Sequence, residues 1–188
     1  MKKILFISAL LFISGCNTVT NVTPTKKITQ TVEPTSEETY QSALELYNNN
    51  FLIQSNQKFL QASQQGHAKA QFRLAKMYYD GKGVDNNPIE AAKWYRKAAE
   101  QGHIEAQYYL GALYFVGGGG AAQSFSKSKQ WYRKAAEQGH IIAQLSLGMM
   151  YYNGKGGQKD FKTAKKWLSL AAAQGNEDAV FILKKLDE

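Results

Sequence analysis

The sequence predicts an all-α protein, a solenoid of stacked helix-turn-helix units, because a helix-forming block recurs along it. Residues 94–103 recur letter for letter as residues 131–140. Aligning the chain on the glycine that ends this block gives spacings of 36, 37 and 36 residues between Gly66, Gly102, Gly139 and Gly175. A period of this length is typical of helix pairs that bury their apolar faces against one another.

Residues 1–15 are typical of a secretory signal peptide, because two lysines precede an apolar run over residues 4–13. Such a run cannot cross a bilayer, which needs about 20 helical residues, so we expect export and removal of the segment. Residues 13–16, Ile-Ser-Gly-Cys, are similar to the bacterial lipobox. This resemblance implies that Cys16 is acylated and becomes the new N-terminus. An ordinary signal peptide followed by a chance cysteine is the alternative.

Residues 16–35 form a threonine-rich stretch with two prolines and almost no large apolar side chains. Such a stretch cannot bury enough surface to fold, so we expect a disordered tether with a root-mean-square span of about 25 Å. Asn17 rather than Asp follows the cysteine, and resemblance to other lipoproteins then implies an outer-membrane anchor facing the periplasm. In a host with one membrane, the protein would lie outside the plasma membrane.

The folded part is predicted to consist of three segments. Residues 36–67 are expected to form a degenerate helix pair that caps the stack, and residues 68–175 three full repeats. Residues 176–188 are expected to form a capping helix with a polar outer face that carries Lys184 and Lys185.

Each full repeat is predicted to contain a helix, a glycine turn and a second helix. In the first one, Ala70 and Leu74 lie at helical spacing, a glycine turn follows, and Pro88 starts a second helical run that Gly102 ends. The corresponding leucines are Leu74, Leu110 and Leu147. A small residue follows each of them, which indicates that paired helices approach closely there: Ala75, Gly111 and Gly148.

These positions form the frame Ala-x-x-x-Leu-Gly-x-x-Tyr, Gly-x-Gly, Ala-x-x-Trp and Ala-Ala-x-x-Gly over residues 68–175. The frame resembles that of the Sel1-like repeat family, a relative of the tetratricopeptide repeats. The chain departs from it in a middle turn that is one residue longer, at Gly117 to Gly120, and in Ser128, which replaces an alanine. The resemblance implies a right-handed superhelix whose concave groove is lined by the first helix of each repeat.

The formal charge of +8 becomes +6 once the two lysines of the signal segment are removed. A positive charge favours anionic surfaces or an acidic partner at low salt, although a lysine-rich solvated surface explains it equally well. Nucleic acid is not expected as a partner outside the cytoplasm.

Three histidines recur at repeat spacing, and imidazole is a common metal ligand. One ligand per repeat would separate successive rings by about 8 to 10 Å, which is too far for one ion to collect them. Asn176 holds the same place as His67, His103 and His140 in the fourth block, and asparagine suits a helix start. We therefore predict that the histidines are structural and that the protein binds no metal or cofactor.

The sequence also predicts that the protein is not an enzyme. Its single cysteine is the proposed anchor, and its acidic residues are scattered rather than paired. The glycine run is not followed by the Lys-Ser or Lys-Thr of a phosphate-binding loop.

One aromatic stripe remains as a candidate site, at positions two before, two after and five after each of the three leucines. Resemblance to tetratricopeptide repeats implies that this stripe faces the concave groove. Aromatic and methionine side chains suit a protein or peptide partner, although Tyr79 and Tyr152 also match the family frame. The stripe comprises Phe72, Lys76, Tyr79, Tyr108, Ala112, Phe115, Leu145, Met149 and Tyr152, of which all but Ala112 are predicted partner-binding residues.

The leading hypothesis is a lipid-anchored, non-enzymatic interaction module in the cell envelope, which holds a partner protein in the groove. A narrower form is an immunity protein that neutralises a lipase-type secreted effector, as some Sel1-like lipoproteins do. An enzyme acting on β-lactams or peptidoglycan is a further alternative, implied by resemblance to a cysteine-rich branch of the family. The missing cysteines argue against that branch. The last alternative is a structural spacer whose groove binds no partner.

Overall fold

The computed structural model describes residues 33–187, and all regular secondary structure in this range is helical. The predicted signal segment, Cys16 and most of the tether lie outside the described residues. The helices are α1 (Ser36–Asn48), α2 (Leu52–Gln64), α3 (Ala68–Asp80), α4 (Pro88–Glu100), α5 (Ile104–Val116), α6 (Phe125–Glu137), α7 (Ile141–Asn153), α8 (Phe161–Ala173) and α9 (Glu177–Asp187).

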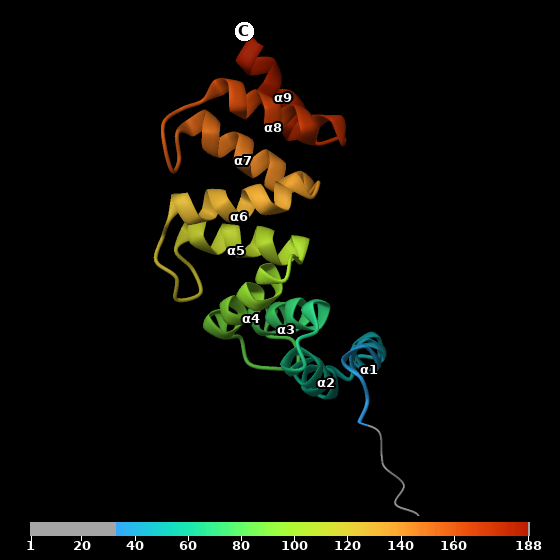
Figure 1. Ribbon diagram of the computed structural model, residues 1–188. Coiled ribbons are helices and arrows are strands. Elements are labelled where there is room, and N and C mark those ends of the chain that lie inside the picture. Colours follow the sequence, from blue (N-terminus) through green and yellow to red (C-terminus); the bar gives the residue numbers. More distant parts are fainter. Residues whose placement is uncertain (1–32, 188) are drawn as a thin grey trace, which may run out of the picture. The chain divides into compact units, whose positions relative to one another are not determined.

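Between residues 33 and 187 the helices stack in chain order, as successive pairs from α1 to α8 followed by the single helix α9 (Figure 1). Each helix packs most closely against its partner within a pair, and the second helix of a pair packs against the first helix of the next. This arrangement confirms the predicted all-α solenoid. None of the helices between residues 33 and 187 is long and apolar enough to span a lipid bilayer.

The core of the stack contains the three leucines and the small residues that follow them. Leu74, Leu110 and Leu147 are fully buried. A Cβ atom added to Gly111 would lie 2.6 Å from the ring of Tyr132, and one added to Gly148 would lie 2.8 Å from Cγ of Leu168. Both distances are too short for real contacts, which confirms that paired helices meet closely at these positions.

In each glycine turn, the glycine two residues after the one that ends the helix packs against the preceding helix pair. A Cβ atom on Gly119 would lie 2.9 Å from the carbonyl oxygen of Pro88, and one on Gly156 would lie 2.8 Å from that of Phe125. Pro88 and Phe125 are each the first residue of a second helix. Only glycine lets the turn backbone reach this neighbour, so the turn contributes to stacking as well as ending a helix.

The three recurring histidines start the first helix of each full repeat. Their Nδ1 atoms accept a hydrogen bond from the backbone N–H three residues later, at 3.1 Å for His67, 3.4 Å for His103 and 3.1 Å for His140. The side chain of Asn176 accepts the equivalent bond from Ala179 at 2.9 Å. The prediction of a structural role at a helix start is therefore confirmed.

The histidine rings also connect successive helix pairs. His67 stacks on Tyr40 with ring centroids 4.4 Å apart, and His103 stacks on Phe72 at 4.6 Å. Tyr40 holds the same place in α1, its fifth residue, that Phe72 holds in α3. The pair α1 and α2 therefore stacks on the next pair as the full repeats do, although its sequence has lost most of the frame.

We expect the histidine caps to weaken at acidic pH. Burial lowers the pKa of His103 and of His140 and outweighs the opposing effect of Glu105. Because the unfolded chain then binds these protons more readily, the contribution to stability is full above about pH 6.5 and is lost as the pH falls below it. Thermal unfolding followed by circular dichroism should show a lower Tm at about pH 5 than at about pH 7.5.

The double variant His103→Asn/His140→Asn is the control, because asparagine already caps α9 in this chain. It should lose part of this pH dependence while folding normally. An unchanged difference between the two pH values would show that other groups cause the acid sensitivity.

Three buried glutamines form a ladder that the sequence analysis missed. Gln107 donates to the carbonyl of Ala99 at 3.2 Å and accepts a hydrogen bond from Gln138 at 2.7 Å. Equivalent bonds recur around Gln71 and Gln144. Each glutamine directly follows a frame alanine, and this recurrence is the signal in the sequence that could have revealed the ladder.

The last helix, α9, closes the stack only in part. Leu145 of α7 and Leu183 of α9 pack around the buried Ala179. Lys184 and Lys185 are exposed, as predicted for a polar outer face, but Val180 and Phe181 are also 52% and 59% exposed. The outer face of α9 is therefore more apolar than the sequence analysis predicts.

Candidate partner-binding site

The eight predicted partner-binding residues lie on the first helices of the three full repeats, α3, α5 and α7. Tyr79 is exposed, with 48% of its surface accessible, and the other seven are partly buried. Their contacts differ according to their position in the repeat, so the stripe is not a uniform surface.

The first position of the stripe lies at the junctions between repeats. Phe72 stacks on His103, and Tyr108 stacks on His140 with ring centroids 4.7 Å apart. Leu145 takes the same place in α7 and packs towards α9. These three side chains therefore pack neighbouring helix pairs against one another. Helical spacing within a single helix, which predicted the stripe, does not reveal such contacts.

The other positions of the stripe make contacts within their own repeat. Lys76 forms an ion pair with Asp80 at 3.1 Å. The ring of Phe115 meets that of Phe125 edge to face at 5.2 Å. Tyr152 makes the same kind of contact with the first residue of α8, at 5.5 Å.

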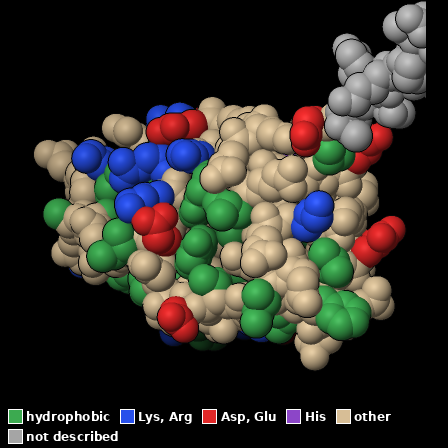
Figure 2. Space-filling view, turned by 90° about the horizontal axis from the view of Figure 1, so that it is seen from below, with side chains coloured by type: hydrophobic (Ala, Val, Ile, Leu, Met, Phe, Trp, Pro, Cys, Tyr) green, Lys and Arg blue, Asp and Glu red, His purple; other side chains and the backbone are tan. Residues whose placement is uncertain are grey.

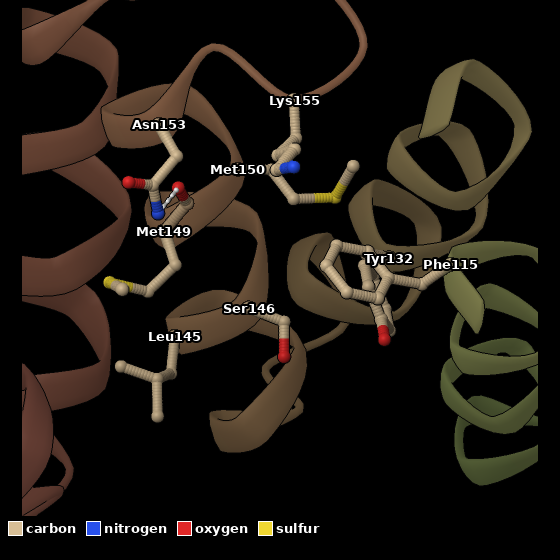
Figure 3. A pocket seen from close by; sticks show the side chains of 8 residues that line it. All are labelled: Phe115, Tyr132, Leu145, Ser146, Met149, Met150, Asn153 and Lys155. Atoms are coloured by element: carbon tan, nitrogen blue, oxygen red, sulfur yellow. Dashed lines mark hydrogen bonds between the residues drawn. The ribbon is translucent and has the colours of Figure 1, made fainter. Parts of the chain in front are cut away.

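A pocket of about 310 Å³ opens between the second and third full repeats (Figure 3). It brings together Phe115, Leu145 and Met149 of the predicted stripe, whereas the other five predicted residues lie outside it. In Figure 3, Met149 and Tyr132 lie on opposite sides of the pocket, with Ser146 between them. The lining residues that the sequence analysis missed are Tyr132, Ser146, Met150, Asn153 and Lys155.

The pocket exists because one aromatic ring is missing from a repeated stack. In the preceding junction, the ring of Tyr109 lies parallel to that of Tyr95, with centroids 5.0 Å apart. Thirty-seven residues later, Tyr95 corresponds to Tyr132, but Tyr109 corresponds to Ser146. The small serine leaves the space above Tyr132 open, which produces the pocket.

The pocket has mostly apolar walls and a few polar groups. Tyr132 is only 5% exposed, and burial raises the pKa of its phenol to about 12, so the phenol stays neutral at physiological pH. Asn153 donates to the carbonyl of Met149 at 3.0 Å. Lys155 is exposed, and its Nζ lies 4.8 Å from the ring centroid of Phe125. The pocket therefore suits an apolar side chain that lies next to an acidic group.

The described residues contain no group of three His, Cys, Asp or Glu side chains that could hold a metal ion. The sequence has one cysteine, so the chain cannot form an internal disulfide. Among residues 33–187, the pocket offers neither a cysteine nor a carboxylate as a nucleophile or base.

The stacked helix pairs, with their buried leucines and glycine turns, define an α solenoid of short repeats. This chain belongs to the Sel1 repeat family, because the family model described as "Sel1 repeat" matches residues 68–103, 104–140 and 141–176. The resemblance seen in the sequence is therefore confirmed. Comparison with curated proteins gave no match.

Two similar solved structures are themselves Sel1-like. A Sel1 repeat protein from Oxalobacter formigenes is 36% identical, with a TM-score of 0.74 over 79% of this chain and 62% of its own. The protective antigen c5321, present in uropathogenic Escherichia coli strains, is 33% identical, with a TM-score of 0.75 over 79% of this chain and 32% of its own. This chain therefore spans less than two thirds of either relative.

A more distant structure shares the fold. The immunity protein Pa5087 from Pseudomonas aeruginosa is 24% identical, with a TM-score of 0.52 over 79% of this chain and 58% of its own. At this identity the likeness is one of fold alone.

Proposed function

We propose that this protein is a non-enzymatic interaction module of the bacterial cell envelope that binds a partner protein in the pocket around Ser146. Sel1 repeats generally mediate protein–protein interaction. The observation that carries the proposal is the pocket itself, which opens where Ser146 replaces the stacked Tyr109.

The partner is expected to insert an apolar side chain beside an acidic residue. Leu145, Met149 and Met150 supply apolar walls, and methionine adapts to ligands of different shape. Lys155 at the edge of the pocket would attract the acidic residue. An aromatic or aliphatic anchor in a desolvated pocket is the usual centre of a protein interface.

The location of the protein is part of the same proposal. The lipobox-like residues 13–16 support acylation of Cys16, and the threonine-rich residues that follow support a tether. The anchor would place the repeats at a membrane of the envelope, with the outer membrane favoured by Asn17. Partners would then be envelope proteins or proteins that enter the envelope.

The variant Ser146→Tyr tests this function, because it fills the pocket with a side chain that the preceding repeat already accommodates. The new ring should stack on Tyr132 as Tyr109 stacks on Tyr95, which offsets the lost hydrogen bond between Ser146 and the Tyr132 phenol, so Tm should change little. Affinity capture from envelope extracts, quantified by mass spectrometry, should then recover the partner at least about tenfold less than with the unmodified protein.

Ser169→Tyr is the matched control, because Ser169 is exposed on α8 and does not line the pocket. It should leave capture unchanged. If Ser146→Tyr folds and captures the same proteins as the unmodified chain, the pocket is not the binding site.

An immunity role is a narrower form of the same proposal. The likeness to Pa5087 supports only the suitability of the scaffold, since it is a likeness of fold. The capture experiment separates the two forms, because an immunity protein would recover a secreted lipase-type effector. Recovery of resident envelope proteins alone would exclude the narrower form.

A further inference from the structure

A second crevice, of about 480 Å³, lies where the glycine turn after α7 crosses α6. It shares no residue with the pocket around Ser146. Its lining contains three cations and no acidic residue: Ser126, Lys129, Gln130, Arg133, Lys134 and Gly156.

Tyr151 holds two of these cations in place without neutralising them. The Nζ atom of Lys129 lies 4.3 Å from the centroid of the Tyr151 ring, and Arg133 donates a hydrogen bond to the Tyr151 hydroxyl. Within residues 33–187, no carboxylate lies within ion-pair distance of Lys129, Arg133 or Lys134. Burial and the neighbouring Arg133 lower the pKa of Lys129, and together they outweigh the opposing effect of Asp160, which lies beyond ion-pair distance.

The preceding helix pair provides an internal comparison. Its corresponding crevice, between α4 and the turn after α5, contains Lys93, Arg96 and Lys97, but it also contains Glu90 and Glu100. Glu90 forms an ion pair with Lys93 at 2.5 Å. Alanine occupies the place of Lys129 there, since residue 92 lies one period earlier. One cation of the first crevice is therefore paired with a carboxylate, and two acidic residues line that crevice, whereas among the described residues the second crevice has neither feature.

The net positive charge of residues 33–187 is concentrated in the part of the chain that contains the second crevice. Residues 117–175 contain nine Lys and Arg against two Asp and Glu, whereas residues 33–116 contain eight against nine. On the face drawn in Figure 2, Lys and Arg side chains also gather in one area rather than spreading evenly. An uneven distribution of this kind directs anions towards one part of a surface.

We propose that the crevice formed by Lys129, Arg133 and Ser126 binds a phosphate group. Arg133 offers the planar, several-donor geometry that matches a tetrahedral oxyanion, and Lys129 adds a second charge. The Ser126 hydroxyl and the Gln130 amide can complete its hydrogen bonds. Ser126 also lies in the first turn of α6, where the helix dipole favours an anion. The phosphate can belong to a lipid headgroup or to a soluble compound.

The test measures phosphate binding by the full chain and by two double variants. Lys129→Gln/Arg133→Gln removes charge from the second crevice. Lys93→Gln/Arg96→Gln is the matched control in the first crevice, and it removes the same residue types, including the equivalent contact of Arg96 with Tyr114. Titration with inorganic phosphate, followed by NMR, should show binding about tenfold weaker in the first variant and nearly unchanged in the second.

A vesicle experiment distinguishes the two sources of phosphate. All three proteins have the same N-terminal segment, so a difference between them reports the crevice alone. Weaker binding of the first double variant to phosphatidylglycerol vesicles, with no difference on phosphatidylcholine vesicles, would assign the crevice to a lipid headgroup. Weaker binding to inorganic phosphate alone would assign it to a soluble compound. Equal behaviour of the two double variants in both experiments would overturn the proposal.

Discussion

Replacing Gly83 by alanine is expected to lower the free energy of unfolding by about 3 kcal/mol or more. The new Cβ atom would lie 2.5 Å from the carbonyl carbon and 2.8 Å from Cβ of Leu52, the first residue of α2. Backbone atoms cannot move away as a flexible side chain can, so the turn and α2 must separate. Urea unfolding followed by circular dichroism measures the loss.

Gly81 provides the control within the same turn. Its φ of +67° is close to the +70° of Gly83, but a Cβ atom there would meet nothing nearer than 3.4 Å. Gly81→Ala should therefore cost only the strain of the left-handed conformation, about 1 kcal/mol. Equal losses for the two variants would show that conformation alone, and not the approach to Leu52, requires glycine at residue 83.

Replacing Gln107 by leucine is expected to cost about 2 kcal/mol, because two hydrogen bonds are lost although the two side chains have similar volumes. The substitution removes the side-chain bond to the buried carbonyl of Ala99 at 3.2 Å and leaves that carbonyl with the backbone N–H of Gly102 as its remaining donor. It also removes the acceptor for Gln138. Because Gln107 joins the ends of α4 and α6 to α5, we expect the loss at the junction between two repeats, which denaturant unfolding would measure.

Gln138→Leu is the comparison for this second prediction. Gln138 is exposed, so its amide is not needed to satisfy a buried group, and Gln107 would retain its bond to Ala99. The loss should stay below about 1 kcal/mol. If Gln138→Leu lowers the free energy of unfolding as much as Gln107→Leu does, the stabilising interaction is the bond between the two glutamines and not the bond from Gln107 to Ala99.

The candidate site was predicted only in part. Helical spacing correctly placed Phe115, Leu145 and Met149 on first helices, and the structure brings these three together in one pocket. The same spacing selected Phe72 and Tyr108, whose rings are stacked on histidines of the next repeat. Periodicity within one helix identifies a face, but it does not say whether the neighbouring repeat covers that face.

The difference between repeats that best locates the pocket is visible in the sequence, but the predicted stripe did not include it. Tyr109 and Ser146 occupy equivalent places one period apart, and the change from a ring to a hydroxyl creates the pocket. A comparison of repeats with one another would have drawn attention to Ser146. It could not have shown that the vacated space lies over Tyr132, since that depends on how α6 packs against α7.

The sequence by itself determined the helix-turn-helix period, the Sel1 frame, the structural role of the histidines and the close approach at Gly111 and Gly148. These features depend on local hydrogen bonds and on spacing within one repeat, so they can be recognised in a single chain. The tertiary structure decided which aromatic rings are covered, where the pocket opens and which cations lack a counterion. Those properties arise between residues about one period apart, which meet only when the stack forms.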